Sequence, residues 1–209
     1  MKPPRAVSVA AALAAALLAA PAARGQDGNP TLFERYARKV EKNPALGKLA
    51  EAPPGGIDRL KWMVGTWDAT SRRYATASIP ERVQKGTRKT SYELNGWWLA
   101  SIDNIGDLKA ASLITEDAYS QKFARLFLSS WGGGLARPMI SNGGLQDGNI
   151  AFEGAIVLFG DPVNVRLRIA KADDNTYYEV WEEKITEDQI VPIFEVKLTR
   201  QKPAAAPAK

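Results

Sequence analysis

The sequence contains no cysteine and no histidine. Without cysteine the chain forms no disulfide bond, so a folded domain must be held by its hydrophobic core. Without histidine it has no Ser-His-Asp or Cys-His catalytic apparatus and no histidine-bound haem. Catalytic zinc is disfavoured for the same reason, because such sites depend on histidine and cysteine ligands. We therefore expect no metal site and no cofactor.

Long apolar runs are confined to the N-terminal leader, residues 1–25. Lys2 and Arg5 precede an alanine-rich apolar run over residues 7–20, and small residues follow at the positions that signal peptidase reads. The alternative is a retained membrane anchor, but the run is short for a hydrocarbon layer of about 30 Å. We expect cleavage of the leader, a periplasmic or secreted protein, and no stable membrane insertion afterwards.

The excess of positive charge is small. The formal net charge is +5, and loss of the leader would remove Lys2, Arg5 and Arg24 but no acidic residue. The remaining basic residues do not gather in the concentrated patch that is typical of a nucleic-acid-binding protein. We expect no nucleic-acid partner, and the sequence carries no signal of the oligomeric state.

Three segments follow the leader. Residues 26–56 are predicted to form a short helix and a linker, because Thr31 and Glu34 have capping-box spacing and prolines and glycines follow. Residues 57–200 form the main domain. The low-complexity tail, residues 201–209, is predicted to be disordered.

The main domain contains about nine strand-like runs separated by turn residues. These runs cover residues 66–74, 83–94, 97–105, 110–118, 123–131, 150–159, 163–170, 176–184 and 190–200. Asn95-Gly96 is the strongest hairpin signal, because both residues tolerate the positive φ of a type I′ turn. Strands at this spacing, without a helical pattern among them, predict a sandwich or a barrel. Short connections favour an up-and-down order.

Alternation along each run assigns one face to the interior, on the assumption that the interior is apolar. The residues assigned to the interior are Tyr92, Leu94, Trp98, Ala100, Ile102, Ala124, Leu126, Leu128, Ile150, Phe152, Ile156, Val163, Val165, Leu167, Ile169, Tyr178, Val180, Phe194, Val196 and Leu198.

The fifth run, residues 123–131, is apolar on both faces. With Leu126 inside, Phe123, Phe127 and Trp131 would lie outside, where a soluble protein tolerates an apolar patch poorly. We expect the apolar stripe of the N-terminal helix to cover them.

The main domain resembles a family of bacterial secreted domains of unknown function with a calycin-like shape, related to lipocalins, fatty-acid-binding proteins and nitrobindins. The matching stretches are Leu60-x-x-Met63-Val64-Gly65-Thr66-Trp67, Gly86-x-x-x-x-Ser91-Tyr92-Glu93-Leu94-Asn95-Gly96-Trp97 and Phe194-Glu195-x-Lys197-Leu198-Thr199-Arg200. The resemblance implies an all-β, antiparallel up-and-down barrel of about ten strands with a short N-terminal helix. It implies no settled activity. Nitrobindins hold haem through a histidine, so haem binding does not carry over to this chain.

Gly65, Trp67 and Arg200 are the residues that we expect to close the barrel. Closure brings the first and last strands together, and a guanidinium stacked on an indole contributes about 0.5–2 kcal/mol. The alternative is an ordinary core tryptophan and an exposed arginine.

No residue set carries a catalytic signature. Glu179, Glu182 and Glu183 could be imagined as paired carboxylates for glycoside chemistry, but Glu182 and Glu183 point to opposite faces of a strand. We expect Glu179 and Glu183 to point outward, in solvated faces. Asp173-Asp174-Asn175 lacks the remainder of a calcium loop and is predicted to be a turn.

The candidate ligand-binding residues are Tyr92, Trp98, Phe152 and Tyr178. All four have a large apolar ring, and the two tyrosines and the tryptophan also carry one polar group. The first hypothesis is an exported barrel that binds a small, largely apolar molecule behind a glycine-rich loop at residues 132–144, without catalysis. The second is a filled barrel that acts as an envelope interaction module. A hydrolase or isomerase that uses acidic or tyrosine groups in the barrel is the third and least supported.

Overall fold

The computed structural model of the chain describes residues 30, 32–48, 52–130, 138–158 and 161–202. These residues fall into two compact units, with the boundary between Pro53 and Pro54. The predicted leader, the first part of the glycine-rich loop and most of the predicted tail lie outside the described residues.

The described part of the N-terminal unit contains two helices, α2 (Leu32–Lys42) and α3 (Ala45–Lys48). Helix α2 covers the segment predicted to be helical. Glu34 lies in its first turn and Lys42 in its last, and both charges interact favourably with the helix dipole. Pro44 follows at the end, where the helix stops.

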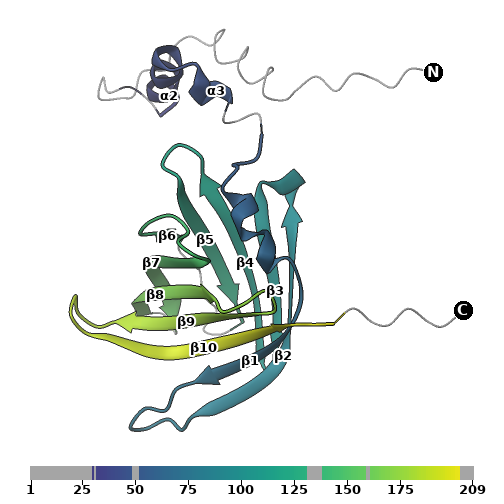
Figure 1. The fold of residues 1–209 in the computed structure, drawn as a ribbon. Helices are drawn as coiled ribbons and strands as arrows, with labels where there is room; N and C mark the ends of the chain where they lie inside the picture. The colour runs from purple at the N-terminus through teal and green to yellow at the C-terminus, as the bar shows by residue number, and fades with distance from the viewer. Residues whose placement is uncertain (1–29, 31, 49–51, 131–137, 159–160, 203–209) are drawn as a thin grey trace, which may run out of the picture. The chain divides into compact units, whose positions relative to one another are not determined.

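The second unit is a closed barrel of ten antiparallel strands, shown in Figure 1. A 3-10 helix, η1 (Ile57–Met63), precedes it. The strands are β1 (Gly65–Arg73), β2 (Arg82–Glu93), β3 (Trp98–Ile105), β4 (Leu108–Asp117), β5 (Lys122–Ser129), β6 (Met139–Ser141), β7 (Asn149–Leu158), β8 (Asp161–Lys171), β9 (Thr176–Lys184) and β10 (Ile190–Arg200). Each strand pairs with its neighbours in sequence, and β10 pairs with β1 to close the ring. The predicted all-β up-and-down barrel is therefore confirmed.

Strand β6 is the shortest element of the ring. It pairs through two residues with β5 and through two with β7, whereas β7 and β8 pair along their whole length. Strand β6 lies at Met139–Ser141, within the segment that the sequence predicted to be a glycine-rich loop.

The connection between β2 and β3 turns where Asn95-Gly96 predicted a hairpin. Glu93 pairs with Trp98, so four residues make the connection instead of two. Leu94 and Asn95 both have positive φ, 48° and 56°, which directs the Leu94 side chain outward. Leu94 is 70% exposed, so its assignment to the interior was wrong.

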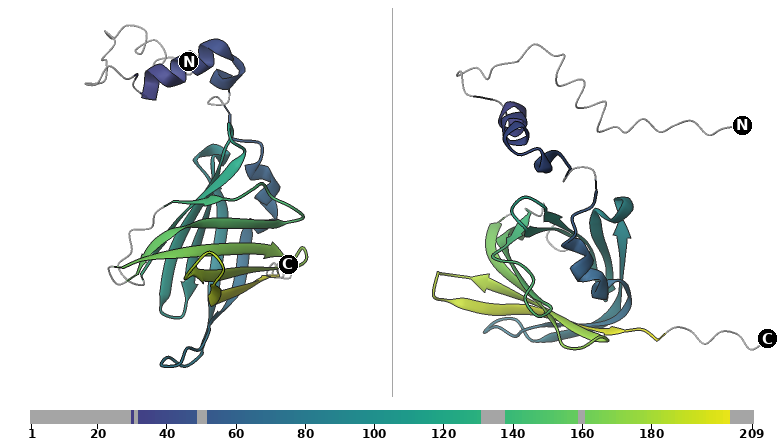
Figure 2. Two further views of the ribbon diagram at one scale, coloured as in Figure 1. Left: turned by 90° about the vertical axis from the view of Figure 1, so that its left-hand side faces the viewer. Right: turned by 45° about the horizontal axis from the view of Figure 1, so that its top comes forward.

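The short helix η1 covers one end of the barrel. Ile57, Leu60 and Met63 are fully buried and belong to the hydrophobic core. The carboxylate of Glu116, on β4, accepts a hydrogen bond from the Gly56 backbone and pairs with Arg59. Figure 2 (right) shows this short blue helical segment within the ring of strands.

The apolar interior faces predicted for three strands are confirmed. Val165, Leu167 and Ile169 are buried on β8, and the same holds for the predicted residues of β7 and for Val196 and Leu198 of β10. These strands lie side by side with one another or with β9, and their inward residues are all apolar, as alternation assumes.

The faces predicted for β3, β5 and β9 are reversed. On β3, Leu99, Ser101, Asp103 and Ile105 are buried, and Ile102 is 51% exposed. The physical reason is that Asp103 pairs with an arginine inside the barrel, so an acidic residue takes the place expected for an apolar one. Trp98 and Ala100 share the outer face with Ile102.

The same reversal occurs on β5 and β9. Phe123 and Arg125 are buried on β5, with Phe127 on the same face, whereas Leu128 is 45% exposed. Ala124 and Leu126 therefore lie on the outer face. Because Phe123 and Phe127 face inward, they do not form the outward aromatic patch that the helix was expected to cover, and Trp131 lies outside the described residues.

On β9 the inward residues are Tyr177, Glu179 and Trp181. Tyr178 and Val180, which were assigned to the interior, face outward. Glu179 was expected in a solvated face and is 1% exposed.

Candidate functional site

Four charged side chains meet inside the barrel. They are Arg88 on β2, Asp103 on β3, Arg125 on β5 and Glu179 on β9. None of the four is more than 3% exposed. Two positive and two negative charges share this space, so the ionic cluster is neutral as a whole.

The hydrogen bonds of the ionic cluster join strands on different sides of the barrel. Arg88 holds Asp103 in a two-pronged contact, with Nη2 donating to Oδ2 at 2.8 Å and Nε to Oδ1 at 2.5 Å. Arg88 also donates to both carboxylate oxygens of Glu179. Arg125 reaches the same two oxygens, at 3.1 and 3.2 Å. All four carboxylate oxygens in the cluster therefore accept at least one N–H.

The protonation states of the ionic cluster follow from these contacts. Burial by itself would raise the pKa of Glu179, but the charges and hydrogen bonds of Arg125 and Arg88 lower it to about 2. Burial works against the charge of Arg88, but Asp103 and Glu179 outweigh it and hold its pKa well above the usual value. Burial raises the pKa of the adjacent Tyr177 to about 12. At neutral pH, Glu179 is an ionised and fully occupied carboxylate, which suits it poorly to proton transfer.

Side chains from β5 and β9 meet at two successive levels inside the barrel. Odd-numbered strands of an up-and-down barrel run in the same direction, so Arg125 and Phe127 follow one another on β5 as Glu179 and Trp181 do on β9. The first level is the Arg125–Glu179 ion pair. The second is an aromatic pair, in which the Phe127 and Trp181 rings lie 4.8 Å apart at 52°.

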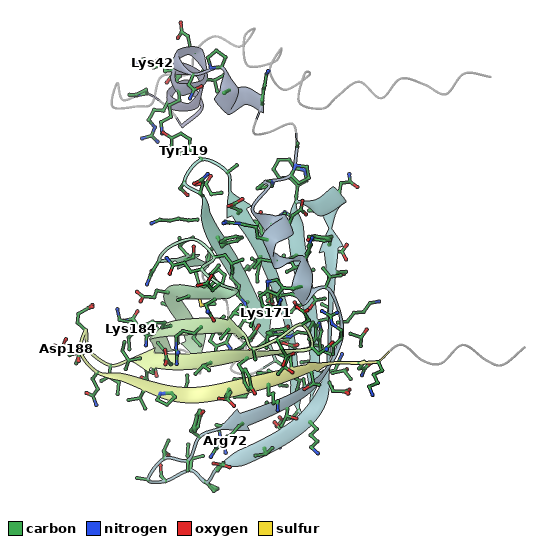
Figure 3. The ribbon with its side chains drawn as sticks, in the orientation of Figure 1. Lys42, Arg72, Tyr119, Lys171, Lys184 and Asp188 are labelled. Carbon is green, nitrogen blue, oxygen red and sulfur yellow. The ribbon has the colours of Figure 1, made fainter. Side chains whose placement is uncertain are left out.

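The aromatic pair lies between the ionic cluster and the barrel end formed by the β1–β2 and β9–β10 hairpins. In Figure 3, Lys184 and Asp188 mark the β9–β10 hairpin and Arg72 marks the end of β1. At the opposite end, the Trp67 and Tyr177 rings meet edge to face at 4.8 Å, below η1.

The interior is mixed in polarity on one side and apolar on the other. The buried polar residues of β1–β4 that face inward are Ser71, Arg88, Thr90, Ser101, Asp103, Ser112 and Glu116, and they alternate with buried apolar residues such as Trp67, Leu99 and Ile114. Thr90 and Ser101 are hydrogen-bonded to each other at 2.9 Å. The buried inward residues of β7, β8 and β10 are Ile150, Phe152, Ile156, Val165, Leu167, Ile169, Val196 and Leu198, all of them apolar. A bound molecule would therefore meet a wall of mixed polarity and an apolar wall.

One donor of the ionic cluster is left over. Arg125 Nε is buried and has no hydrogen-bond partner among the residues that the structure describes. Its guanidinium carbon lies 5.6 Å from the Trp181 ring and 5.9 Å from the Phe127 ring. A guanidinium N–H can only donate, so this position calls for an acceptor.

The barrel is closed by the stack that the sequence predicted. Trp67 and Arg200 are register partners on β1 and β10, and the guanidinium carbon lies 4.1 Å from the centre of the indole ring. Arg200 also donates to the backbone oxygens of Trp62 and Val64, at 2.6 and 2.8 Å. Gly65 has φ of 135°, and a Cβ there would lie 2.7 Å from Arg200 Nη1, so glycine leaves room for the stack.

The four candidate ligand residues divide between the two sides of the barrel wall. Phe152 is fully buried on β7, and Tyr92 lies inside on β2, where burial, aided by the Asp58 carboxylate, raises the pKa of its hydroxyl. Trp98 and Tyr178 face outward, so their assignment to the interior was wrong. Tyr178 instead lies beneath the Lys197 ammonium, 5.9 Å from its ring centre.

The ionic cluster was not predicted from the sequence, although one of its members, Arg125, gave a usable signal. Arg88 lies in a run that is polar on both faces, so alternation carries no information there. Arg125, by contrast, interrupts the apolar run Phe123-Ala-Arg-Leu-Phe-Leu128. A lone arginine in such a run predicts a buried charge with an acidic partner, and Glu179 was the partner to find.

The structure gives no sign of a metal centre or a membrane-spanning helix in the part of the chain that it describes. No group of three or more acidic residues there is placed to hold a metal ion. None of the helices within the described ranges has both the length and the apolar character needed to cross a bilayer.

No protein-family model and no curated protein matches this sequence. Among solved structures, the barrel is similar to the crystal structure of Rv2717c from M. tuberculosis, with a TM-score of 0.52 and 10% identity over 72% of this chain and all of that chain. A redesigned beta barrel, b11L5F_LGL, matches with a TM-score of 0.30 and 10% identity over 68% of this chain and 94% of that one. At these identities the likeness to Rv2717c concerns the barrel fold alone.

Proposed function

We propose that this protein is an exported, non-catalytic carrier that binds one small, largely apolar molecule inside its barrel. The observation that carries the proposal is the Arg125 Nε donor, which has no partner within the described part of the chain and lies beside two aromatic rings. Binding sites for small molecules are mostly apolar, with few polar groups that orient the ligand. The two-sided interior has this composition.

Export and calycin-like ancestry belong to the same proposal. The basic start, the apolar run and the small residues of the leader support export. The closed barrel and its indole–guanidinium stack support the resemblance to calycins, many of which hold ligands inside the barrel.

Tryptophan fluorescence tests the proposal, because Trp181 lies next to the site. The chain without its leader would be titrated with a panel of small lipophiles, and we expect quenching that saturates. Trp181→Phe should abolish most of the signal. Trp98→Phe is the matched control, because Trp98 lies on the outer face of β3, and it should leave the titration unchanged. A panel without any saturable response would contradict the proposal.

A second candidate function is an interaction module that meets another envelope protein. It is favoured by the outer face of β3–β6, where Ile102, Leu128 and Ile140 are 51%, 45% and 44% exposed. The register places Ile102 and Leu128 on either side of Ala111, and Ala100 and Leu126 on either side of Leu113. An apolar patch of this kind marks an interaction site in many soluble proteins.

Site-specific photo-crosslinking in the host tests this second candidate. A photoreactive residue at Ile102 should crosslink to one partner protein, and the same residue at Lys197, on the outer face of β10, should not. Absence of a crosslink at Ile102 would exclude the interaction module.

A further inference from the structure

The barrel interior also indicates the chemistry of the ligand, and this step rests on the proposed function. We infer that the ligand is an uncharged lipophile with a carbonyl-type hydrogen-bond acceptor, such as an ester, a ketone or an amide, and that its oxygen accepts a hydrogen bond from Arg125 Nε. Its apolar body would lie against the aromatic pair and the apolar wall of β7, β8 and β10.

The charge of the ionic cluster excludes a carboxylate. Arg88 and Arg125 are already matched by Asp103 and Glu179, and all four side chains are withdrawn from water. A ligand carboxylate at Arg125 would make the cluster net negative and would lie close to Glu179. Burying an unbalanced charge is costly. A cationic ligand would meet the same penalty with the opposite sign.

The leftover donor excludes a pure hydrocarbon. Arg125 uses Nη1 and Nη2 for Glu179, and Nε has no partner among the residues described. An alkane would leave that N–H buried and unpaired, whereas a carbonyl oxygen would satisfy it. A hydrogen bond from a charged donor is among the stronger polar contacts.

The neighbours of Arg125 define where the apolar body lies. Arg125 is the register partner of Met139, which is fully buried, and a Cβ at Gly154 would touch Met139 Cγ at 2.8 Å. Trp181 pairs with Leu167 in the β8–β9 register. The aromatic pair and the apolar wall are thus continuous with the position of the free donor.

Three ligands with similar chains separate these alternatives. Methyl decanoate, sodium decanoate and n-decane would be titrated against the leaderless protein at pH 8, with Trp181 fluorescence as the readout. We expect the ester to bind about ten-fold more tightly than decane, because decane leaves the Arg125 Nε–H without its hydrogen bond. We expect at least the same difference from decanoate, because decanoate adds an unbalanced buried charge.

A conservative variant tests the role of Arg125 itself. Arg125→Lys keeps a positive charge for Glu179 but lacks the Nε donor, so the preference for ester over alkane should fall about ten-fold. Arg166→Lys is the matched control, because Arg166 Nε donates to Glu182 at 2.7 Å on the outer face. That variant should keep the full preference.

The outcomes distinguish a failure of this inference from a failure of the proposed function. Tighter or equal binding of decanoate overturns the inference and leaves the proposed function standing. Equal binding of decane and ester overturns the requirement for an acceptor. Binding of none of the three ligands by the wild-type chain removes the proposed function and the inference together, and it does so whether or not Arg125→Lys folds.

Discussion

At the scale of single residues, Glu179 joins the two arginines of the ionic cluster. Its two oxygens accept hydrogen bonds from both Arg88 and Arg125. Glu179→Gln would leave a net positive charge in the interior, and breaking a buried ion pair on one side costs about 3–5 kcal/mol. We expect a loss of this size in the free energy of unfolding, measured by urea denaturation.

The matched control is Glu182→Gln, three residues further along β9 and on its outer face. Glu182 also pairs with two arginines, Arg166 and Arg168. The Glu182 side chain is 7% exposed, but those of its partners are 30% and 51% exposed. Ion pairs with exposed partners contribute about 0.2–1 kcal/mol each. An equal loss in the two variants would show that burial of the arginine partners does not strengthen the role of Glu179.

The same carboxylate predicts a dependence of stability on acid. The pKa of Glu179 is about 2 in the folded protein against 4.5 as its ordinary value. A lowered folded pKa adds stability above the ordinary value, and that contribution is lost as the pH falls from 4.5 through 2. The side-chain carboxyl carbon of Glu179, followed by NMR, should show no titration step between pH 7 and pH 3. A midpoint near 4.5 would contradict the ionic cluster.

At the scale of elements, the pairing of β2 with β3 requires glycine at position 86. A Cβ on Gly86 would lie 1.9 Å from the backbone oxygen of Asn104 and 2.5 Å from Ile105 Cα. Gly86→Ala must push the two strands apart, near the Arg88–Asp103 contact. Overpacking of this kind costs about 1–3 kcal/mol.

Thermal unfolding measures this effect, with Gly143→Ala as the control. A Cβ at Gly143 would meet nothing within 4 Å, so its midpoint should stay within the error of the wild type. A Gly86→Ala midpoint equal to that of Gly143→Ala would mean that β2 and β3 do not approach so closely.

The strands also show which features of the fold could be predicted from the sequence. Strand bounds were predicted to within a few residues, because turn residues separate the runs and most connections are short. Inward faces were correct for β7, β8 and β10, where the interior is apolar. They were reversed for β3, because Asp103 points inward to Arg88 while Ile102 points out. Alternation assumes an apolar interior, and half of this barrel departs from that assumption.

The candidate site was predicted less well than the fold, for the same reason. Its charged members come from four strands, and no local spacing in the sequence links Arg88 to Glu179. Only the strand order, which brings β2, β3, β5 and β9 around one interior, places them together. Trp67 and Arg200 were predictable because barrel closure itself dictates that first and last strands meet.

At the scale of the whole molecule, Arg200 joins the last strand to the segment before the first. It stacks on Trp67 and donates to the backbone oxygens of Trp62 and Val64. A cation–π contact contributes about 0.5–2 kcal/mol and a hydrogen bond from a charged group about 1.5–3 kcal/mol. Arg200→Ala should therefore cost at least about 2 kcal/mol in urea unfolding.

Arg200→Lys refines this prediction. Lysine keeps the charge but lacks the planar fork that stacks and reaches two carbonyl groups, so it should recover less than half of the loss. Full recovery with lysine would show that charge alone, and not the stack, secures closure.

The carrier account is tested most directly by native mass spectrometry of the protein purified from its own host. The account predicts a species heavier than the leaderless polypeptide that returns to the polypeptide mass on denaturation. It also predicts one-to-one uptake of methyl decanoate by protein that has been stripped of ligand. The bare polypeptide mass both before and after incubation with the ester would contradict it.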